Sequence, residues 1–249
     1  MRLGHNGVVA APTPPVRTGA AGWSDVDRVD RYLERIDVVA SRRAGEDVQR
    51  SLLPPAPVSL LDLGTGDGRL VSLSLDARPG IRRVVAVDNS PAMLERARHR
   101  FTGDRRVTLE HVDLSQPVDG LGTFDVVISG SAIHHLEDRR KQTLFAEIVR
   151  LLNPGGLFAN LEVVASATPE LHAEFLALIG RPADDPEDRL ADVDSQLQWM
   201  TRAGMVQVDC LWRWRGFALL VGRGRGTPPG AEVGVTDRET APVGGEPCP

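Results

Sequence analysis

Three glycines at alternate positions follow a short apolar run, at Gly64, Gly66 and Gly68 in the stretch LLDLGTGDGRL. Glycine has no side chain, so a loop of this composition lets the backbone approach a ligand closely. Two carboxylates, Asp62 and Asp67, lie in the same stretch, and they would repel a phosphate strongly in a partly buried site. The residue types therefore favour a ligand with a cationic part, such as an ammonium or sulfonium group.

The spacing of these glycines also separates the loop from two common nucleotide sites. A dinucleotide loop has glycines at the first, third and sixth positions of G-x-G-x-x-G, and Arg69 stands at the sixth position here. A Walker loop ends in Gly-Lys-Ser or Gly-Lys-Thr, which does not follow. The pattern thus argues against a nicotinamide or flavin cofactor and against a Walker-type phosphate site.

Strands and helices that alternate along the chain must position this loop. Near-continuous apolar runs of strand length are typical of strands covered on both faces. Ser90 before Pro91 predicts the start of one helix, and apolar residues from Leu144 to Leu152 predict another, which ends at residues 153–156. The strands are expected at residues 59–63, 83–88, 107–112, 125–130 and 157–163.

This alternation predicts an α/β fold with a parallel, doubly wound sheet that binds its ligand at the carboxyl ends of the strands. An amphipathic helix is expected over residues 24–40, and a shorter helix should end before Pro54. After the fifth strand, residues 164–203 predict helices and loops that cap the ligand edge. A closing antiparallel hairpin, at residues 206–214 and 216–222, would complete a seven-stranded sheet.

Length and composition set the wider limits. The chain has 249 residues and a net charge of −5, which disfavours nucleic acid and anionic membranes as partners. We expect one domain over residues 23–222, with disordered tails at residues 1–22 and 223–249, which are rich in Gly and Pro. Its two cysteines form no pairing pattern, no signal peptide is expected and no apolar run could span a bilayer, so we expect a cytoplasmic protein.

The glycine stretch resembles motif I of the class I S-adenosylmethionine-dependent methyltransferases, in which an acidic residue precedes G-x-G-x-G. The resemblance covers roughly residues 55–222 and implies a Rossmann-like fold with S-adenosyl-L-methionine as cofactor. Other segments resemble the family pattern in the same order, namely VVAVDNSPAML (84–94), VTLEHVDL (107–114), FDVVISGSAIHHLED (124–138) and LLNPGGLFANLE (151–162).

The resemblance also implies roles for single residues. Asp88, at the end of the second strand, would accept hydrogen bonds from the ribose hydroxyls, and Asp113 would lie against the adenine amino group. Asp62 would attract the amino group of the methionine part, directly or through water, and Asp67 would serve as an acid at a helix N-terminus. The predicted cofactor-binding residues are Tyr32, Asp62, Gly64, Thr65, Gly66, Asp88, Asn89, Met93, Asp113, Leu114 and Ser129.

Two histidines follow the fourth strand, where methyl donor and acceptor should meet. A base is needed only if the acceptor must lose a proton, and we predict His134 and His135 as the catalytic candidates. In many family members a similar His-His-Leu only packs and hydrogen-bonds this loop, so a structural role stays open. We expect no metal site, because adjacent histidines are not spaced as a chelating pair on a helix face.

The acceptor side of the site is predicted from the end of the fifth strand and from the first helix of the cap. We expect Glu162, His172 and Phe175 to line it. Residues 182–195 hold six acids against one arginine, which is typical of a solvated loop; facing the pocket, they would favour a neutral or cationic acceptor. Trp212 and Trp214 share one side of a strand and are expected to pack rather than to stack on a substrate.

The expected activity is methyl transfer to an O, N or C atom of a small-molecule acceptor, mainly by positioning and desolvation. One alternative is a tRNA-modifying or carboxy-S-adenosylmethionine-synthase-like enzyme, because the hairpin after Gly204 resembles a hairpin of the carboxy-S-adenosylmethionine synthases. Another is a non-catalytic, cofactor-binding regulatory subunit. A homodimer stays open, and no membrane partner is expected.

Overall fold

The computed structural model of the protein describes residues 29, 33 and 40–226. The predicted helix over residues 24–40 therefore lies almost wholly outside the described residues, and so do Tyr32 and most of both predicted tails. None of the described helices is long and apolar enough to cross a membrane.

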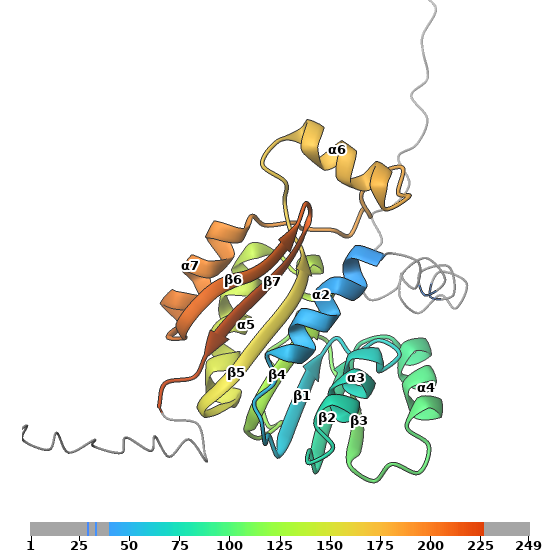
Figure 1. Cartoon of the computed structure of the whole chain (residues 1–249), viewed down its shortest axis with the longest axis vertical. Coiled ribbons are helices and arrows are strands. Elements are labelled where there is room, and N and C mark those ends of the chain that lie inside the picture. Colours follow the sequence, from blue (N-terminus) through green and yellow to red (C-terminus); the bar gives the residue numbers. More distant parts are fainter. Residues whose placement is uncertain (1–28, 30–32, 34–39, 227–249) are drawn as a thin grey trace, which may run out of the picture.

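Seven strands form one sheet in the order β3-β2-β1-β4-β5-β7-β6 (Figure 1). The pairs from β3 through β5 are parallel, and β7 runs antiparallel to both of its neighbours. This confirms the predicted Rossmann-like sheet with a closing hairpin. The strands are β1 (Ser59–Leu63), β2 (Arg83–Asp88), β3 (Val107–His111), β4 (Phe124–Gly130), β5 (Leu152–Val163), β6 (Val206–Trp214) and β7 (Phe217–Arg223).

The strand order reverses at β1, which lies between β2 and β4. Chain connections leave β1 and β4 in opposite directions across the sheet, so a crevice opens between their carboxyl ends. All five residues of β1 are buried, which agrees with the apolar run that predicts it. The fold thus places the glycine loop, directly after β1, at the ligand edge.

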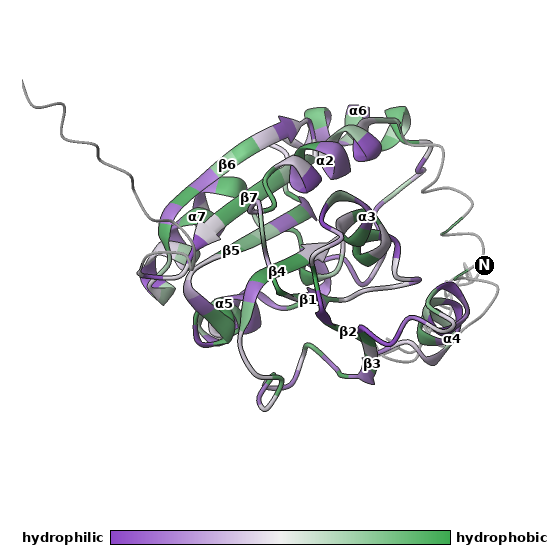
Figure 2. Ribbon diagram, turned by 60° about the horizontal axis from the view of Figure 1, so that its bottom comes forward, coloured by the Kyte–Doolittle hydropathy of each residue, from purple (hydrophilic) through white to green (hydrophobic). Residues whose placement is uncertain are grey.

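Helices cover both faces of the sheet and bury two apolar layers (Figures 1 and 2). On one face, α2 (Ala40–Ser51) and α3 (Arg69–Ala77) enclose a core that includes Leu60, Val84 and Val126. On the other, α5 (Asp138–Leu151) and α7 (Val193–Ala203) enclose a core around Phe145 and Phe158. The remaining elements are α4 (Pro91–Arg100), η1 (Ile133–His135) and α6 (Pro169–Leu178).

Helix α4 begins as the sequence predicts. The hydroxyl of Ser90 accepts a hydrogen bond from the backbone nitrogen of Met93 at 3.2 Å, and Pro91 follows as the first helical residue. Leu152 differs from its prediction, because it starts β5 rather than continuing α5 and pairs with Phe124. Pro154 restrains only Asn153, the residue before it, to extended geometry, but Leu152 has already left the helix, with a ψ angle of 132°.

The predicted cap splits into two parts. Helix α7 packs against α5 and β6 and so covers the sheet face, whereas α6 stands beyond the ends of β5 and β7 (Figure 1). Within residues 164–203, the part at the ligand edge is therefore the segment before α7. The domain and cap boundaries stay predictions.

Candidate functional site

The glycine loop leaves β1 and turns sharply into α3. Gly64 and Gly66 have φ angles of 75° and 56°, which glycine adopts without steric cost. The backbone nitrogens of Gly64 and Thr65 donate to the carbonyl of Val87, at 2.9 and 2.8 Å. A Cβ at Gly64 would lie 2.2 Å from that of Ala132. The loop after β4 therefore closes directly against the glycine loop.

Asp88 ends β2 and holds the glycine loop in place. Its Oδ2 accepts from the backbone nitrogen of Gly66, and its Oδ1 accepts from that of Ser90, both at 2.8 Å. Burial raises the pKa of this carboxyl, and the backbone donors oppose the rise. Each carboxylate oxygen can accept more than one hydrogen bond, so the geometry fits the predicted ribose contact.

Asp62 lies on β1 and is fully buried. Its Oδ2 accepts from the Thr65 hydroxyl at 2.7 Å, whereas its Oδ1 has no hydrogen-bond partner among the described residues. Burial raises the pKa of this carboxyl to about 7; the Thr65 hydrogen bond lowers it, and repulsion from Asp88 and Asp67 adds to the rise. A buried acceptor without a donor is costly. The site therefore fits a ligand that brings a cationic N–H group.

Asp67 is paired with other groups than Asp62 is. Its Oδ1 accepts from the backbone nitrogen of Arg69, at the first residue of α3, at 3.2 Å. Its other oxygen pairs with the guanidinium of Arg100. The structure thus gives Asp67 the predicted place at a helix N-terminus.

Two predicted apolar contacts line the loop. The sulfur of Met93 lies 3.8 Å from the position that a Cβ on Gly66 would occupy, and Leu114 lies 3.9 Å from the equivalent position on Gly64. Both side chains are buried. They form apolar walls beside the backbone that would meet the cofactor.

Three other predicted cofactor residues lie near this edge and make local contacts. Asp113 accepts from the backbone nitrogen two residues later at 2.8 Å, and the carbonyl of Asn89 lies 3.1 Å from His111 Nε2. The hydroxyl of Ser129 donates to the carbonyl of Leu63 at 2.7 Å and so ties β4 to β1. Cofactor contacts of these residues stay predictions.

A buried arginine, Arg42, lies beside the loop, and no sequence pattern indicates it. Glu46 on α2 accepts from Arg69 Nε at 3.0 and 3.1 Å, and Arg42 Nε lies 3.5 Å from Glu46. Arg42 is only 7% exposed, and its Nη1 has no hydrogen-bond partner among the described residues. A buried guanidinium with a spare donor fits a carboxylate.

The two predicted catalytic histidines lie side by side on η1. Their ring centroids are 4.0 Å apart. His134 Nδ1 lies 2.6 Å from Glu162 Oε1, and the His134 backbone nitrogen donates to Glu162 Oε2 at 3.0 Å. Both Glu162 oxygens are thus directed at His134. The structure assigns Glu162 a role in holding that imidazole, and a direct acceptor contact for it stays a prediction.

Asp188, from the acidic stretch of the cap, meets the same histidines. Its Oδ1 lies 3.4 Å from both His134 Nε2 and His135 Nδ1. Burial disfavours a charged His134, but the carboxylates of Glu162 and Asp188 outweigh it and raise the pKa of the imidazole to about 9. A base must be free to accept a proton near neutral pH. His134 therefore suits positioning better than proton abstraction.

His172 and Phe175, predicted at the acceptor site, lie together on α6. Phe175 is fully buried and meets the ring of Phe217 edge-on, with centroids 5.1 Å apart. His172 Nε2 lies 2.8 Å from Asp184, and its Nδ1 lies 3.2 Å from the hydroxyl of Ser166. Among the described residues, the contacts of this pair are with Ser166, Asp184 and aromatic rings rather than with His134 or His135, and their acceptor role stays a prediction. Trp212 and Trp214 pack against the same apolar cluster, as expected.

Asn160 is a buried polar residue that the sequence reading misses. It lies on β5 beside Ser129, is fully buried, and both atoms of its amide group lack a hydrogen-bond partner among the described residues. It lies in an apolar run, where nothing but the residue type marks it.

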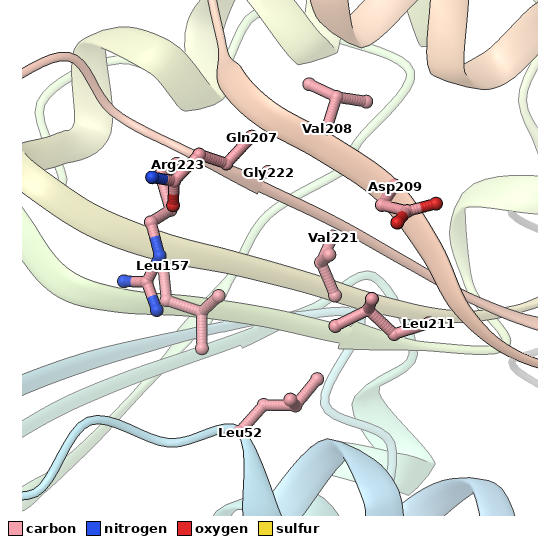
Figure 3. A pocket seen from close by; sticks show the side chains of 9 residues that line it. All are labelled: Leu52, Leu157, Gln207, Val208, Asp209, Leu211, Val221, Gly222 and Arg223. Carbon is pink, nitrogen blue, oxygen red and sulfur yellow. The ribbon is translucent and has the colours of Figure 1, made fainter.

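A groove of about 380 Å³ lies at the other end of the sheet (Figure 3). Leu52, Leu157, Leu211 and Arg223 are among the residues that line it. Leu157 pairs with Val126 near the start of β4, whereas the glycine loop follows the carboxyl end of β1. The groove is therefore separate from the candidate site.

Comparisons with known proteins lead to methyltransferases. A family model described as "Methyltransferase domain" matches residues 60–156. An uncharacterized methyltransferase of Mycobacterium tuberculosis is 36% identical over 121 residues, which are 49% of this chain and 57% of the relative. A demethylmenaquinone methyltransferase of Clavibacter sepedonicus is 35% identical over 121 residues, 48% of this chain and 47% of the relative. The chain thus spans about half the length of the curated relatives it matches.

Solved structures support the fold. An O-methyltransferase family protein from Burkholderia thailandensis superposes with a TM-score of 0.65 at 20% identity, over 81% of this chain and 61% of that one. Human N-acetylserotonin methyltransferase in complex with SAM gives a TM-score of 0.61 at 16% identity, over 84% and 59% of the two chains. The motif order, the sheet and the matched family model together lead to one conclusion. Residues 60–156, which carry the glycine loop, match the methyltransferase family, and the fold is that of the class I S-adenosylmethionine-dependent methyltransferases.

Proposed function

We propose that the chain binds S-adenosylmethionine at the glycine loop and transfers its methyl group to a small-molecule acceptor. The observation that carries this proposal is Asp62, whose buried Oδ1 meets no donor in the part of the chain that the structure describes, while Asp88 holds the loop beside it. A phosphate ligand would face two carboxylates there. A ligand with an amino group and a ribose offers Asp62 an N–H donor and Asp88 hydroxyl donors.

Arg42 extends the same site. Its guanidinium is buried, and Glu46 links it to Arg69 at the start of α3. A cofactor with an amino acid part carries a carboxylate as well as an amino group. We assign the carboxylate to Arg42 and the amino group to Asp62, so that each charge of the ligand meets a buried partner of opposite sign.

The bound cofactor supplies an electrophilic methyl group on a sulfonium. The protein's own part is to position the acceptor and to exclude water, because in-line displacement gains most from these two effects. Glu162 and Asp188 hold His134 between β5 and the cap. This cluster closes the acceptor side and leaves the chemistry to positioning.

The binding half of the proposal is tested by titrating the protein with S-adenosylmethionine and with its demethylated product in a calorimeter. Wild-type protein should bind both, and Arg42→Met should weaken binding at least tenfold, since a buried carboxylate would lose its partner. Arg43→Met is the matched control, because Arg43 is the next residue on α2 and is exposed. Equal affinity in the two variants would remove Arg42 from the site, and no binding by wild type would overturn the cofactor assignment.

The transfer half needs a screen of metabolite acceptors with labelled cofactor. Label in a small-molecule product that forms only with active protein would support the proposal. Label that appears only in added tRNA would instead favour the nucleic-acid alternative. Cofactor binding with no labelled product in either pool would favour the regulatory subunit.

A further inference from the structure

Two imidazoles and a carboxylate converge where the cap meets the loop after β4. His134 Nε2, His135 Nδ1 and a carboxylate oxygen of Asp188 lie within 4.8 Å of one another. We propose that these three atoms form a binding site for a zinc-class divalent cation, which fastens the cap to this loop. The proposal does not depend on methyl transfer.

The distances in this cluster suit a shared ion. Asp188 Oδ1 lies 3.4 Å from each ring nitrogen, longer than the roughly 2.7–3.2 Å of an ordinary N–H···O hydrogen bond. Zinc binds histidine nitrogen and carboxylate oxygen at about 2.0–2.2 Å in a tetrahedron, whose edges are then about 3.4 Å long. The two separations from Asp188 are therefore those between neighbouring ligands of one tetrahedral ion.

The carboxylates of this cluster are buried, so a bound cation would stabilise them. The side chains of Asp188 and His134 are only 3% and 6% exposed. Asp188 Oδ2 accepts from Arg181 Nη2 at 3.2 Å and from the backbone nitrogen of Asp185 at 3.1 Å. No hydrogen bond of ordinary geometry from the described residues reaches Oδ1. A buried carboxylate oxygen left in this way is costly unless a cation meets it.

Glu162 orients the His134 ring from the side opposite to Asp188. His134 Nδ1 faces Glu162 Oε1 at 2.6 Å, so Nε2 is the nitrogen that faces Asp188. Histidine ligands of metals commonly donate their second ring nitrogen to a carboxylate in this way, which fixes the ring and raises its basicity. The adjacent histidines, which are not spaced as a helical pair, are brought together by the 3-10 turn of η1.

The charges and donor types indicate the class of ion. His134 must give up its proton to bind a metal. That leaves two carboxylates, Glu162 and Asp188, against one guanidinium, that of Arg181, so the cluster can accept the charge of a divalent cation. Imidazole suits zinc, cobalt and nickel, whereas magnesium and calcium prefer oxygen ligands throughout. Three protein ligands leave a fourth position for water or another oxygen.

The proposed ion would join contacts that already hold the cap. The backbone nitrogen of Arg189 donates to the carbonyl of His134 at 2.9 Å, and Arg189 Nε donates to Glu137 at 2.9 Å. Lys141 donates to the carbonyl of Arg189. An ion on Asp188, the preceding residue, would tie the same short segment to the loop after β4.

The test uses the full chain after treatment with a chelator. Titration with zinc in a calorimeter, and with cobalt(II) followed by visible absorption, should show one ion per chain and the spectrum of a tetrahedral site. His135→Asn and Asp188→Asn should each weaken zinc binding at least tenfold, and Glu162→Gln about 10- to 100-fold. His99→Asn is the control, because His99 is 80% exposed and lies on α4. Circular dichroism of each variant without metal checks that it is folded.

Two results would overturn the proposal. One is wild-type protein that binds no stoichiometric zinc or cobalt. The other is zinc binding of wild-type strength in folded His135→Asn and Asp188→Asn variants, which would place the ion elsewhere. The fastening role has its own readout, since zinc should slow amide hydrogen exchange in residues 182–192. Unchanged exchange in zinc-bound protein would refute that role.

Discussion

The carboxylate of Asp88 accepts a hydrogen bond from the backbone nitrogen of Gly66 at 2.8 Å. This bond joins the end of β2 to the loop that follows β1, so two motifs separated by 22 positions act as one unit. The acid therefore has two tasks, to hold the loop and to meet the ligand. Its replacement should affect both.

We predict that Asp88→Asn weakens S-adenosylmethionine binding about 10- to 100-fold, because hydrogen bonds to a charged group contribute roughly 1.5–3 kcal/mol each. Asn keeps the size of the side chain but loses the charge and one acceptor. The measurement is calorimetric titration. Asp67→Asn is the matched control in the same loop, since Asp67 pairs with Arg100 instead; a loss as large as that of Asp88→Asn would contradict the assigned roles.

The raised pKa of Asp62 leads us to predict that cofactor binding depends on pH. Burial raises its pKa to about 7, and only the ionised carboxylate attracts an ammonium group. Affinity should therefore rise with pH and level off above about 7, and each pH unit below that should cost about tenfold. Calorimetric titrations between about pH 5 and 8 would show how the affinity depends on pH. Asp62→Asn should bind weakly with no such slope, and a retained slope would assign it to another group.

The same group has the opposite effect on the stability of the cofactor-free protein. The pKa of Asp62 is higher in the folded chain than its ordinary value of 3.8, so the folded state binds the proton more tightly. The stability that this adds is fully present below pH 3.8 and is lost as the pH rises towards about 7. The urea midpoint of the wild type should therefore fall more over this range than that of Asp62→Asn.

Gly64 and Gly103 offer a matched pair for the close approach of two loops. Both have positive φ angles, of 75° and 83°, but a Cβ at Gly64 would lie 2.2 Å from that of Ala132, whereas one at Gly103 meets nothing within 4 Å. Gly103→Ala should cost about 1–2 kcal/mol from backbone strain. Gly64→Ala should cost about 1–3 kcal/mol more from overpacking. Urea unfolding measures both, and equal losses would refute the contact.

Local sequence patterns predicted the strands and the acidic residues whose positions depend on neighbouring residues in the chain. The strands at residues 59–63 and 83–88 coincide with β1 and β2, because strands buried on both faces need continuous apolar runs. Asp62 and Asp88 could be found for a related reason, since each lies at a fixed place relative to a strand end and a glycine loop.

The residues that the sequence reading missed depend on distant contacts. Asp188 lies in a run of acids of which most are solvated, and nothing local shows that this one meets two histidines more than 50 positions earlier. Arg42 resembles the exposed Arg43 beside it. The packing of α2 against α3 and the sheet, and not the local sequence, separates the buried arginine from the exposed one.

The last prediction concerns Asn160 and tests whether its buried amide group has hydrogen-bond partners. Both amide atoms lack a hydrogen-bond partner among the described residues, and the side chain is fully buried. An unpaired buried amide costs about 1–3 kcal/mol, and an apolar group of similar shape removes that cost. Asn160→Leu should therefore raise the free energy of unfolding by about 1 kcal/mol, measured in urea without cofactor. Asn160→Asp is the companion variant and should destabilise the fold, because it buries a charge. A loss of stability in Asn160→Leu would contradict this expectation and would favour a partner for the amide, such as a buried water molecule, which the leucine could not hold.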